Sequence, residues 1–481
     1  MTSEHDRWQP ELTMLNQNRL EQLHQAALEI LAAVGLNVHH PEMLEQLKQA
    51  GAQVGENSRV RLPGEMIQQA LESAPSEVVI YNREGKAAMP LLPHRIYFGT
   101  GSDLIYTYNS GKEEQRKSVL SDVANSARLC DALEEIDFVM SFALPADVPN
   151  EDAETEQFYT ILKNTVKPSI MTSFSGLEAL ERMHEMACLV AGGQENFSAR
   201  PNYILYGQFV SPLEHDAQAL ERLIFCAKHQ IPLIYVPTIM SGASGPLTTY
   251  GSLALALSET LAGLVMHQLQ HPGAPFITGS CLSPLDMKTG LFPYGSAEWR
   301  LNDLAMAELA RWYGLPVFGT GGATDSKIPD AQAGGEYAGS LLAAALAGTN
   351  LIHDVGYLNS GLTGSLESIV LGADLIRWVK RFLNGIEVSA DTLAREVIEE
   401  IGPAGEFLSH DHTFDHLHQF AWQPYTLDHQ DYDTWLAEGG KDYALRALEY
   451  AEELLEDHQP AALEPDLDRA LQNLRRSSPD Q

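Results

Sequence analysis

The chain has 481 residues, 44% of them hydrophobic and 20% charged, which is enough for one large domain or several small ones. Its 65 acidic and 31 basic residues give a formal net charge of −34, which argues against nucleic acid or an anionic membrane as the partner, because both would be repelled. The same charge is compatible with a cationic or zwitterionic ligand, or with acidity that serves solubility alone.

Neither a secretory signal nor a membrane span is expected. Residues 1–19 are polar and mixed in charge, and no run approaches the roughly 18 uninterrupted apolar residues of a membrane helix. The cysteines are widely spaced and form no CxxC pair, so no disulfide framework or thiolate zinc site is expected from Cys130, Cys188, Cys226 and Cys281. These features predict a cytoplasmic protein.

Residues 1–94 are predicted to form a cap of helices with small β pieces. Apolar residues recur with a helical period in residues 19–34, 41–50 and 63–74, and residues 77–81 are typical of a short strand.

Residues 95–385 alternate between β-rich apolar runs and amphipathic helices. The eight runs are residues 95–108, 137–143, 169–174, 203–210, 232–238, 275–281, 316–319 and 350–355. Helices are expected between them, for example over residues 119–135, 252–270, 298–313 and 332–347, and a further helix over residues 368–383. Eight strand–helix units over about 290 residues predict an α/β fold, a parallel (β/α)8 barrel.

The rival fold is a doubly wound open sheet. That fold usually carries a Gly-rich phosphate turn after its first strand, and Gly99-Thr100-Gly101 does not complete a GxGxxG motif. The barrel is therefore preferred. The same two glycines leave open whether residues 95–108 form one strand or a hairpin.

Residues 386–481 are predicted to form a helical extension. Asp433 or Thr434 is placed to cap a helix that starts at Trp435, and a further helix is expected over residues 441–457. Four histidines of this extension have metal-like spacings, but they lie in a polar, acidic segment outside the barrel, and no metal is predicted at His410, His412, His416 and His418.

The chemistry of a (β/α)8 barrel lies at the C-terminal ends of its strands and in the loops that follow. Several aromatic rings around one pocket would bind a quaternary ammonium by cation–π attraction, although an aromatic residue on a strand is more often part of the core. Aromatic residues at or near the predicted strand ends are Tyr97, Phe98, Tyr106, Tyr108, Phe174 and Tyr357. Neither an HExxH nor a GxxxxGK[ST] motif occurs, so neither a zincin nor a P-loop phosphotransferase is supported.

A series of short motifs resembles the trimethylamine methyltransferase family. The strongest is YGLPVFGTGGATDSKIPDAQAGGE at residues 313–336, and others lie at residues 111–149, 164–168, 211–213, 268–279 and 347–350. The resemblance implies a methyltransferase on a (β/α)8 barrel. Such an enzyme binds no cofactor tightly itself and moves a methyl group from a methylated amine to the cobalt of a corrinoid (cobalamin) carried by a separate protein.

The branch of the family follows from the residue types. The methanogen trimethylamine enzymes use pyrrolysine, whereas this sequence has only the twenty standard residues. It therefore resembles the non-pyrrolysine branch, which includes a glycine betaine methyltransferase. A quaternary ammonium is already activated, because loss of one methyl group leaves a neutral amine. The barrel then needs to bind the cation, exclude water and aim one methyl group outward.

We hypothesise roles for residues at the predicted strand ends. The wall that faces the cation would be formed by Tyr97, Phe98, Phe174 and Tyr357. Gln208 and His353 would hold the carboxylate or another polar end of the substrate, and Asp103 would add negative charge near the ammonium. The mouth would be kept open to the corrinoid by Gly319, Gly321 and Gly322.

Other interpretations stay open. The same reaction could use carnitine, proline betaine or γ-butyrobetaine, or the barrel could bind betaines without catalysis. An open apolar strip around the mouth favours the enzyme, and a closed mouth favours the binding protein. A Schiff-base lyase would need a lysine inside the barrel, whereas Lys163, Lys167 and Lys327 are predicted in loops or helix ends. The cap and the extension could serve as an interface in a homo-oligomer.

Overall fold

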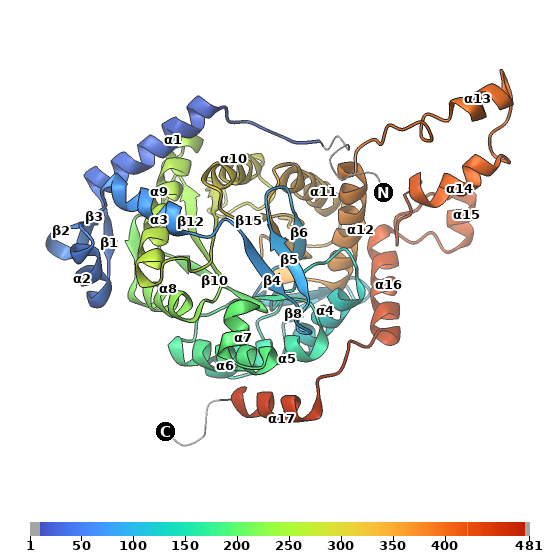
Figure 1. Ribbon diagram of the computed structural model, residues 1–481. Coiled ribbons are helices and arrows are strands. Elements are labelled where there is room, and N and C mark those ends of the chain that lie inside the picture. The colour runs from blue at the N-terminus through green and yellow to red at the C-terminus, as the bar shows by residue number, and fades with distance from the viewer. Residues whose placement is uncertain (1–9, 421, 477–481) are drawn as a thin grey trace.

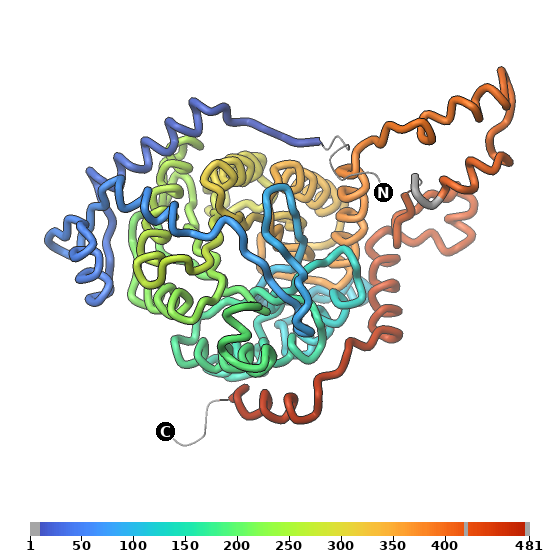
Figure 2. The backbone as a smooth tube through the Cα atoms, viewed as in Figure 1, coloured from blue at the N-terminus to red at the C-terminus, as the bar shows by residue number. Residues whose placement is uncertain are grey.

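The centre of the molecule is a closed ring of parallel strands. The computed structural model describes residues 10–420 and 422–476. Its strands are hydrogen-bonded in the order β6–β16–β15–β13–β12–β10–β9. Figure 1 and Figure 2 show this core surrounded by helices. The ring is closed by the segment after α4, because Phe138 bridges to Gly99 of β6 and Val139 bridges to Ser169 of β9. The predicted (β/α)8 barrel is therefore confirmed.

Each strand of the ring is followed by a helix that packs on its outside. The strands are β6 (Tyr97–Thr100), β9 (Ser169–Thr172), β10 (Tyr203–Phe209), β12 (Leu233–Ser241), β13 (Phe276–Gly279), β15 (Val317–Thr320) and β16 (Leu351–Val355). The helices are α4 (Leu120–Ala132), α5 (Ala153–Asn164), α6 (Leu177–Ala191), α8 (Ala217–His229), α9 (Thr249–Gln270), α10 (Ala297–Tyr313), α11 (Ala331–Leu346) and α12 (Leu366–Leu383).

Three of the predicted strands are interrupted. The run at 95–108 divides into β6 and β7 (Tyr106–Asn109), which lie in different sheets, so it forms neither one strand nor a hairpin of its own. β7 instead pairs antiparallel with β8 (Glu114–Lys117), beyond the predicted run. The run at 275–281 ends as β13, and the chain continues as β14 (Cys281–Pro284) beside β12. The run at 137–143 contributes only isolated bridges to its neighbours.

A β-hairpin closes the N-terminal end of the barrel. Its strands are β4 (Val78–Tyr81) and β5 (Ala87–Leu91), which lie in front of the ring in Figure 1. Apolar side chains of both strands pack against the side chains that point inward from the ring, such as Ile204, Ile234 and Phe318. The interior is therefore a packed core at this end and is open only where the strands finish.

The other N-terminal elements pack around α9. They are α1 (Gln17–Glu29), a π-helical turn (Ile30–Val34), α2 (Pro41–Gln49), α3 (Gly64–Ser73) and the short strands β1 (Leu36–Val38), β2 (Gln53–Val54) and β3 (Arg59–Arg61). Helices α1, α2 and α3 contact α9, whose inner side lies on β12. Among the described residues, α9 alone is long and apolar enough to cross a membrane, and 83% of its most apolar window is buried inside the molecule. Because the N-terminal helices cover the outer side of α9 and β12 covers its inner side, α9 is apolar around its whole circumference.

Glu259 is a carboxylate buried within this apolar helix. It accepts hydrogen bonds from the backbone N–H of Leu213 and from the hydroxyl of Ser211, in the loop after β10. Burial raises the pKa of Glu259 from 4.5 to about 7. The folded protein therefore holds this proton more tightly than the unfolded chain does.

The pH dependence of stability is expected to reflect Glu259. Its contribution is fully present below pH 4.5 and is lost as the pH rises through about 7, because the unfolded chain binds fewer protons than the folded one in that window. Urea unfolding of the wild type and Glu259→Gln across pH 5 to 8 measures this effect. The stability of the wild type should fall relative to the variant by about 3 kcal/mol. If the free energies of unfolding of the two proteins changed in parallel with pH, the raised pKa of Glu259 would be contradicted.

The C-terminal extension wraps around one side of the barrel and carries a projecting arm. It contains α13 (Arg395–Ile401), α14 (Asp411–Phe420), α15 (Tyr432–Ala437), α16 (Tyr443–Asp457) and α17 (Pro465–Leu474). Helix α16 packs on α12 and α4, and α17 on α6, whereas α13 and α14 project from the body (Figure 2). The predicted start at Trp435 is wrong. Asp431 caps α15 by accepting from the N–H of Thr434, which places the helix start three residues earlier.

Candidate active site

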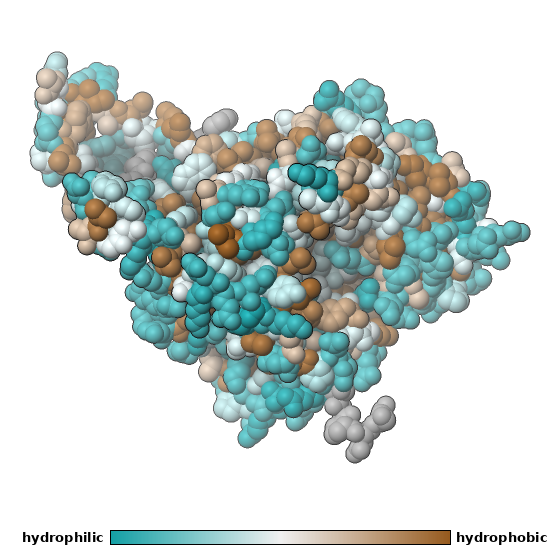
Figure 3. Space-filling view, turned by 180° about the vertical axis from the view of Figure 1, so that it is seen from behind, coloured by the Kyte–Doolittle hydropathy of each residue, from teal (hydrophilic) through white to brown (hydrophobic). Residues whose placement is uncertain are grey.

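A cavity of about 580 Å³ lies at the end of the barrel where the strands finish. Figure 3 views the molecule from the side opposite to the β4–β5 hairpin, and brown apolar residues there alternate with teal polar ones. The cavity is lined by residues from the strand ends, from the loops that follow them and from α8. They are Ser102, Asp103, Thr172, Ser173, Phe174, Tyr206, Gln208, Gln218, Arg222, Thr238, Cys281, Phe292, Tyr294, His353, Asp354, Tyr357 and Gly361.

Asp103 brings a negative charge to the cavity wall. One carboxylate oxygen accepts from the hydroxyl of Thr172 at 2.6 Å, and the other accepts from Ser141 at 2.8 Å and from the amide of Gln157 at 3.1 Å. All three donors are neutral, and no lysine or arginine pairs with Asp103 in the described part of the chain. The arrangement fixes the carboxylate in place and leaves its charge uncompensated, as a site for a cation requires.

Aromatic rings form much of the remaining wall. Tyr294 lies edge-on to Tyr357 with the ring centroids 6.3 Å apart, and Phe292 lies edge-on to Tyr294 at 6.1 Å. Tyr206 comes from β10, deeper in the barrel, and Phe174 stands at the rim with 45% of its surface exposed. Aromatic rings that line a cavity, with a carboxylate beside them, suit a quaternary ammonium.

His353 and Asp354 lie beside each other at the base of the cavity. Nδ1 of His353 lies 2.9 Å from the carbonyl oxygen of Gly319, so Nδ1 carries a hydrogen, and burial lowers the pKa of the imidazole to about 3. Nε2 is then an acceptor 3.2 Å from Oδ1 of Asp354, whose pKa is raised well above its usual value by burial. With Nδ1 bonded to Gly319 and the imidazole neutral, Nε2 carries no hydrogen. His353 therefore has no free N–H for a substrate carboxylate, contrary to the prediction.

Arg300 lies behind this pair and balances two buried carboxylates. Its guanidinium donates to the carbonyl oxygen of Thr320 at 2.6 Å and lies 3.5 Å from Asp303. Burial raises the pKa of Asp303 to about 7, and the positive charge of Arg300 opposes the rise in pKa of both Asp303 and Asp354. One cation with two acids is neutral overall when one of the two acids holds a proton.

Tyr97 and Phe98 do not reach the cavity, so their predicted place in the cation-facing wall is wrong. Tyr97 points into the barrel at its closed end, where it packs beside the β4–β5 hairpin and its hydroxyl donates to the carbonyl oxygen of Pro90. Phe98 is fully buried and points outward, with Nζ of Lys380 lying 5.5 Å above its ring. Both residues start β6 rather than end it.

The glycines near 320 are packing positions and do not face the mouth. Because Phe318 points into the barrel, Gly319 points outward, where an added Cβ would lie 3.1 Å from Thr349. A Cβ on Gly321 would lie 2.7 Å from Ile352, and one on Gly322 would lie 3.1 Å from Val355. The predicted corrinoid-facing role of Gly319, Gly321 and Gly322 is therefore wrong.

Other predicted residues do meet in the cavity, together with several that the prediction missed. The structure brings together Asp103, Phe174, Gln208, His353 and Tyr357. Gln208 donates its amide to the hydroxyl of Tyr206, which lies 3.6 Å from Sγ of Cys281. The missed residues that matter most are Tyr206, Phe292, Tyr294 and Arg222. Of these, Tyr206 alone carried a signal, because it lies two residues before Gln208 and so on the same inward face.

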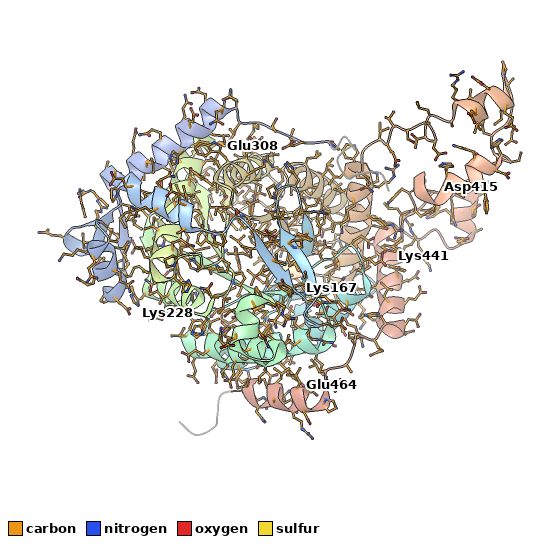
Figure 4. All side chains as sticks on the ribbon, viewed as in Figure 1. Lys167, Lys228, Glu308, Asp415, Lys441 and Glu464 are labelled. Carbon is orange, nitrogen blue, oxygen red and sulfur yellow. The ribbon has the colours of Figure 1, made fainter. Side chains whose placement is uncertain are left out.

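No lysine lines the cavity among the described residues. Lys167, labelled in Figure 4, is instead held at the end of α4, where Nζ donates to the carbonyl oxygens of Cys130, Leu133 and Ile136 at 2.5–2.6 Å. This placement argues against a Schiff-base lyase.

Gly101 makes room for the ring of Tyr357. A Cβ on Gly101 would lie 2.1 Å from Cζ of that ring, whose hydroxyl donates to the carbonyl oxygen of Ser102. Gly101→Ala is therefore expected to displace Tyr357 and to lower the free energy of unfolding by roughly 1–3 kcal/mol. Urea unfolding measures the loss. Gly334→Ala is the matched control, since a Cβ there meets nothing within 4 Å. Equal stabilities of the two variants would contradict the packing argument.

Comparison with known proteins gives one family. A family model described as trimethylamine methyltransferase (MTTB) matches residues 2–478. Trimethylamine methyltransferase MttB of Desulfitobacterium hafniense is 34% identical over 474 residues, which is 98% of this chain and 95% of that protein. The glycine betaine methyltransferase of Desulfitobacterium hafniense strain Y51 is 31% identical over 467 residues, 96% of each chain.

Among solved structures, a similar fold is that of the monomethylamine methyltransferase (MtmB) of Methanosarcina barkeri. The match covers 93% of this chain and 88% of that chain, with a TM-score of 0.51 and 11% sequence identity. At this identity the likeness concerns the fold alone.

Proposed function

The chain belongs to the trimethylamine methyltransferase family, and from this premise we propose that it moves a methyl group from a quaternary amine to the Co(I) of a corrinoid on a partner protein. Glycine betaine is the first choice of substrate, and the dimethylated amine is the product. Carnitine, proline betaine and γ-butyrobetaine are the alternatives. A glycine betaine methyltransferase among the relatives is consistent with this choice.

The observation that carries the proposal is the pairing of Asp103 with aromatic rings in one cavity. Asp103 supplies a fixed negative charge, and Tyr294 and Tyr357 supply faces that attract a cation without hydrogen-bonding to it. A quaternary ammonium has no N–H to donate, so it fits such a wall better than a protonated amine, which would seek hydrogen-bond acceptors.

The mouth of the cavity is open and has an apolar rim. Every loop that follows a ring strand, from β6 and β9 through β16, contributes at least one large hydrophobic side chain that is at least 42% exposed, namely Ile105, Phe174, Val210, Leu247, Met287, Leu291, Ile328 and Leu362. Exposed hydrophobic side chains on all of these loops favour an interaction surface at this end of the barrel, which suits the docking of a flat macrocycle with its carrier protein. It favours the enzyme over a closed betaine-binding barrel.

The residues of this chain would act by positioning. A reduced corrinoid supplies the nucleophile when its carrier docks at the mouth. The C–N bond breaks with its electron pair left on nitrogen, so the amine leaves neutral and needs no proton at that step. The chain has to hold the ammonium against Asp103 and the rings, keep water away from it and point one methyl group at the mouth.

Methyl transfer from glycine betaine to reduced free cobalamin tests the proposal, with trimethylamine in a parallel reaction. The expected result is a change in the visible spectrum of cobalamin with glycine betaine alone. A change only with another quaternary amine would move the substrate within the class. No change with any quaternary amine, even with the corrinoid protein added, would contradict methyl transfer.

A further inference from the structure

Arg222 is the single lysine or arginine on the cavity wall in the described part of the chain. It lies on α8, the helix after β10, and Gln218 lies one turn earlier on the same helix, so both side chains face the cavity together. The helix starts at Ala217, and its positive end therefore lies on the same side of the molecule as both residues.

Arg222 has no acidic partner. It forms no hydrogen bond or ion pair with any of the residues 10–420 and 422–476, although acids outnumber bases about two to one in the chain. Two other partly buried arginines of the barrel are paired, since Arg182 lies 3.2 Å from Asp152 and Arg300 lies 3.5 Å from Asp303. A half-buried guanidinium without a carboxylate is ready for an anionic ligand.

The cavity wall therefore has one negative pole and one positive pole. Asp103, from the β6 end, is a carboxylate held by neutral donors, and Arg222, from α8, is an unpaired cation. The two charges do not pair with each other, so each remains available to a ligand. A ligand with an ammonium at one end and a carboxylate at the other matches both poles at once.

We propose that Arg222, assisted by Gln218, binds the carboxylate of a zwitterionic quaternary amine and selects it over quaternary amines that lack a carboxylate. This inference rests on the proposed function and assigns the specificity of the same site. The residues predicted for this role are less suitable. The two ring nitrogens of His353 already face the carbonyl oxygen of Gly319 and the carboxyl group of Asp354. Gln208 already donates its amide to the hydroxyl of Tyr206.

The test compares two methylated cations that differ in the carboxylate. Glycine betaine and tetramethylammonium are each titrated into the full-length protein by calorimetry, and each is used as methyl donor. Arg222→Gln should weaken binding of glycine betaine by about 10- to 100-fold, with a matching rise in KM, because a charge-assisted hydrogen-bonded pair is lost. Tetramethylammonium should bind as in the wild type, and Arg222→Lys should restore part of the affinity for glycine betaine.

Lys228→Gln is the matched control, because it removes the same charge from the exposed last turn of α8 (Figure 4). It should leave both ligands unaffected. An equal loss for both ligands in Arg222→Gln, or no loss for glycine betaine, would overturn the inference. Failure of the wild type to transfer a methyl group would count against the proposed function instead, and calorimetry would still decide the role of Arg222.

Discussion

Asp103→Asn is expected to lower kcat/KM for glycine betaine by about 30- to 100-fold. The variant keeps the shape of the side chain and one oxygen for Thr172, but it removes the charge that faces the ammonium. Two unit charges about 4–5 Å apart in a partly desolvated site interact by roughly 3–4 kcal/mol, and access of water through the open mouth reduces that figure to about 2–3 kcal/mol.

The measurement is the rate of methyl transfer over a range of glycine betaine concentrations. Thr172→Val is the control, because it removes one hydrogen bond to Asp103 and leaves the charge in place. It should cost several-fold less than Asp103→Asn. If Asp103→Asn left kcat/KM unchanged, the ammonium would have to lie against the aromatic wall alone, away from Asp103.

The architecture could be predicted from the sequence because it follows from local patterns. Apolar β-rich runs alternated with amphipathic helices eight times, and the structure has a helix after each strand of the ring. The same patterns do not give the depth of a residue along the barrel axis. Tyr97 points inward as the alternation requires, but it lies at the closed end, because the β4–β5 hairpin fills the barrel there.

The sequence indicates the orientation of some residues near the site and not of others. Phe318 is a large residue that points into the barrel, and because side chains alternate along a strand, Gly319 is expected on the outer face. Arg222 lies on a helix, so the positions of the strand ends in the sequence do not indicate it. Phe292 and Tyr294 lie in the loop between β14 and α10, and no period in the sequence tells how such a loop folds back over the mouth.

Arg300→Gln is expected to destabilise the protein by about 3–5 kcal/mol, the usual cost of removing one partner from a buried ionic group. The variant would leave Asp303 and Asp354 close together in the barrel wall without a cation, and it would also lose the bond to the carbonyl oxygen of Thr320. Urea unfolding at neutral pH measures the loss.

The double variant Arg300→Gln/Asp303→Asn separates charge from packing. With Asp303 replaced by a neutral amide, Asp354 no longer lies near a second carboxylate, so part of the lost stability should return. If the double variant were no more stable than Arg300→Gln, the loss would come from packing and from the Thr320 bond instead. A single-variant loss below about 1 kcal/mol would mean that water reaches these acids in the folded protein. The cavity floor would then be wet, which is incompatible with a site that excludes water from the ammonium.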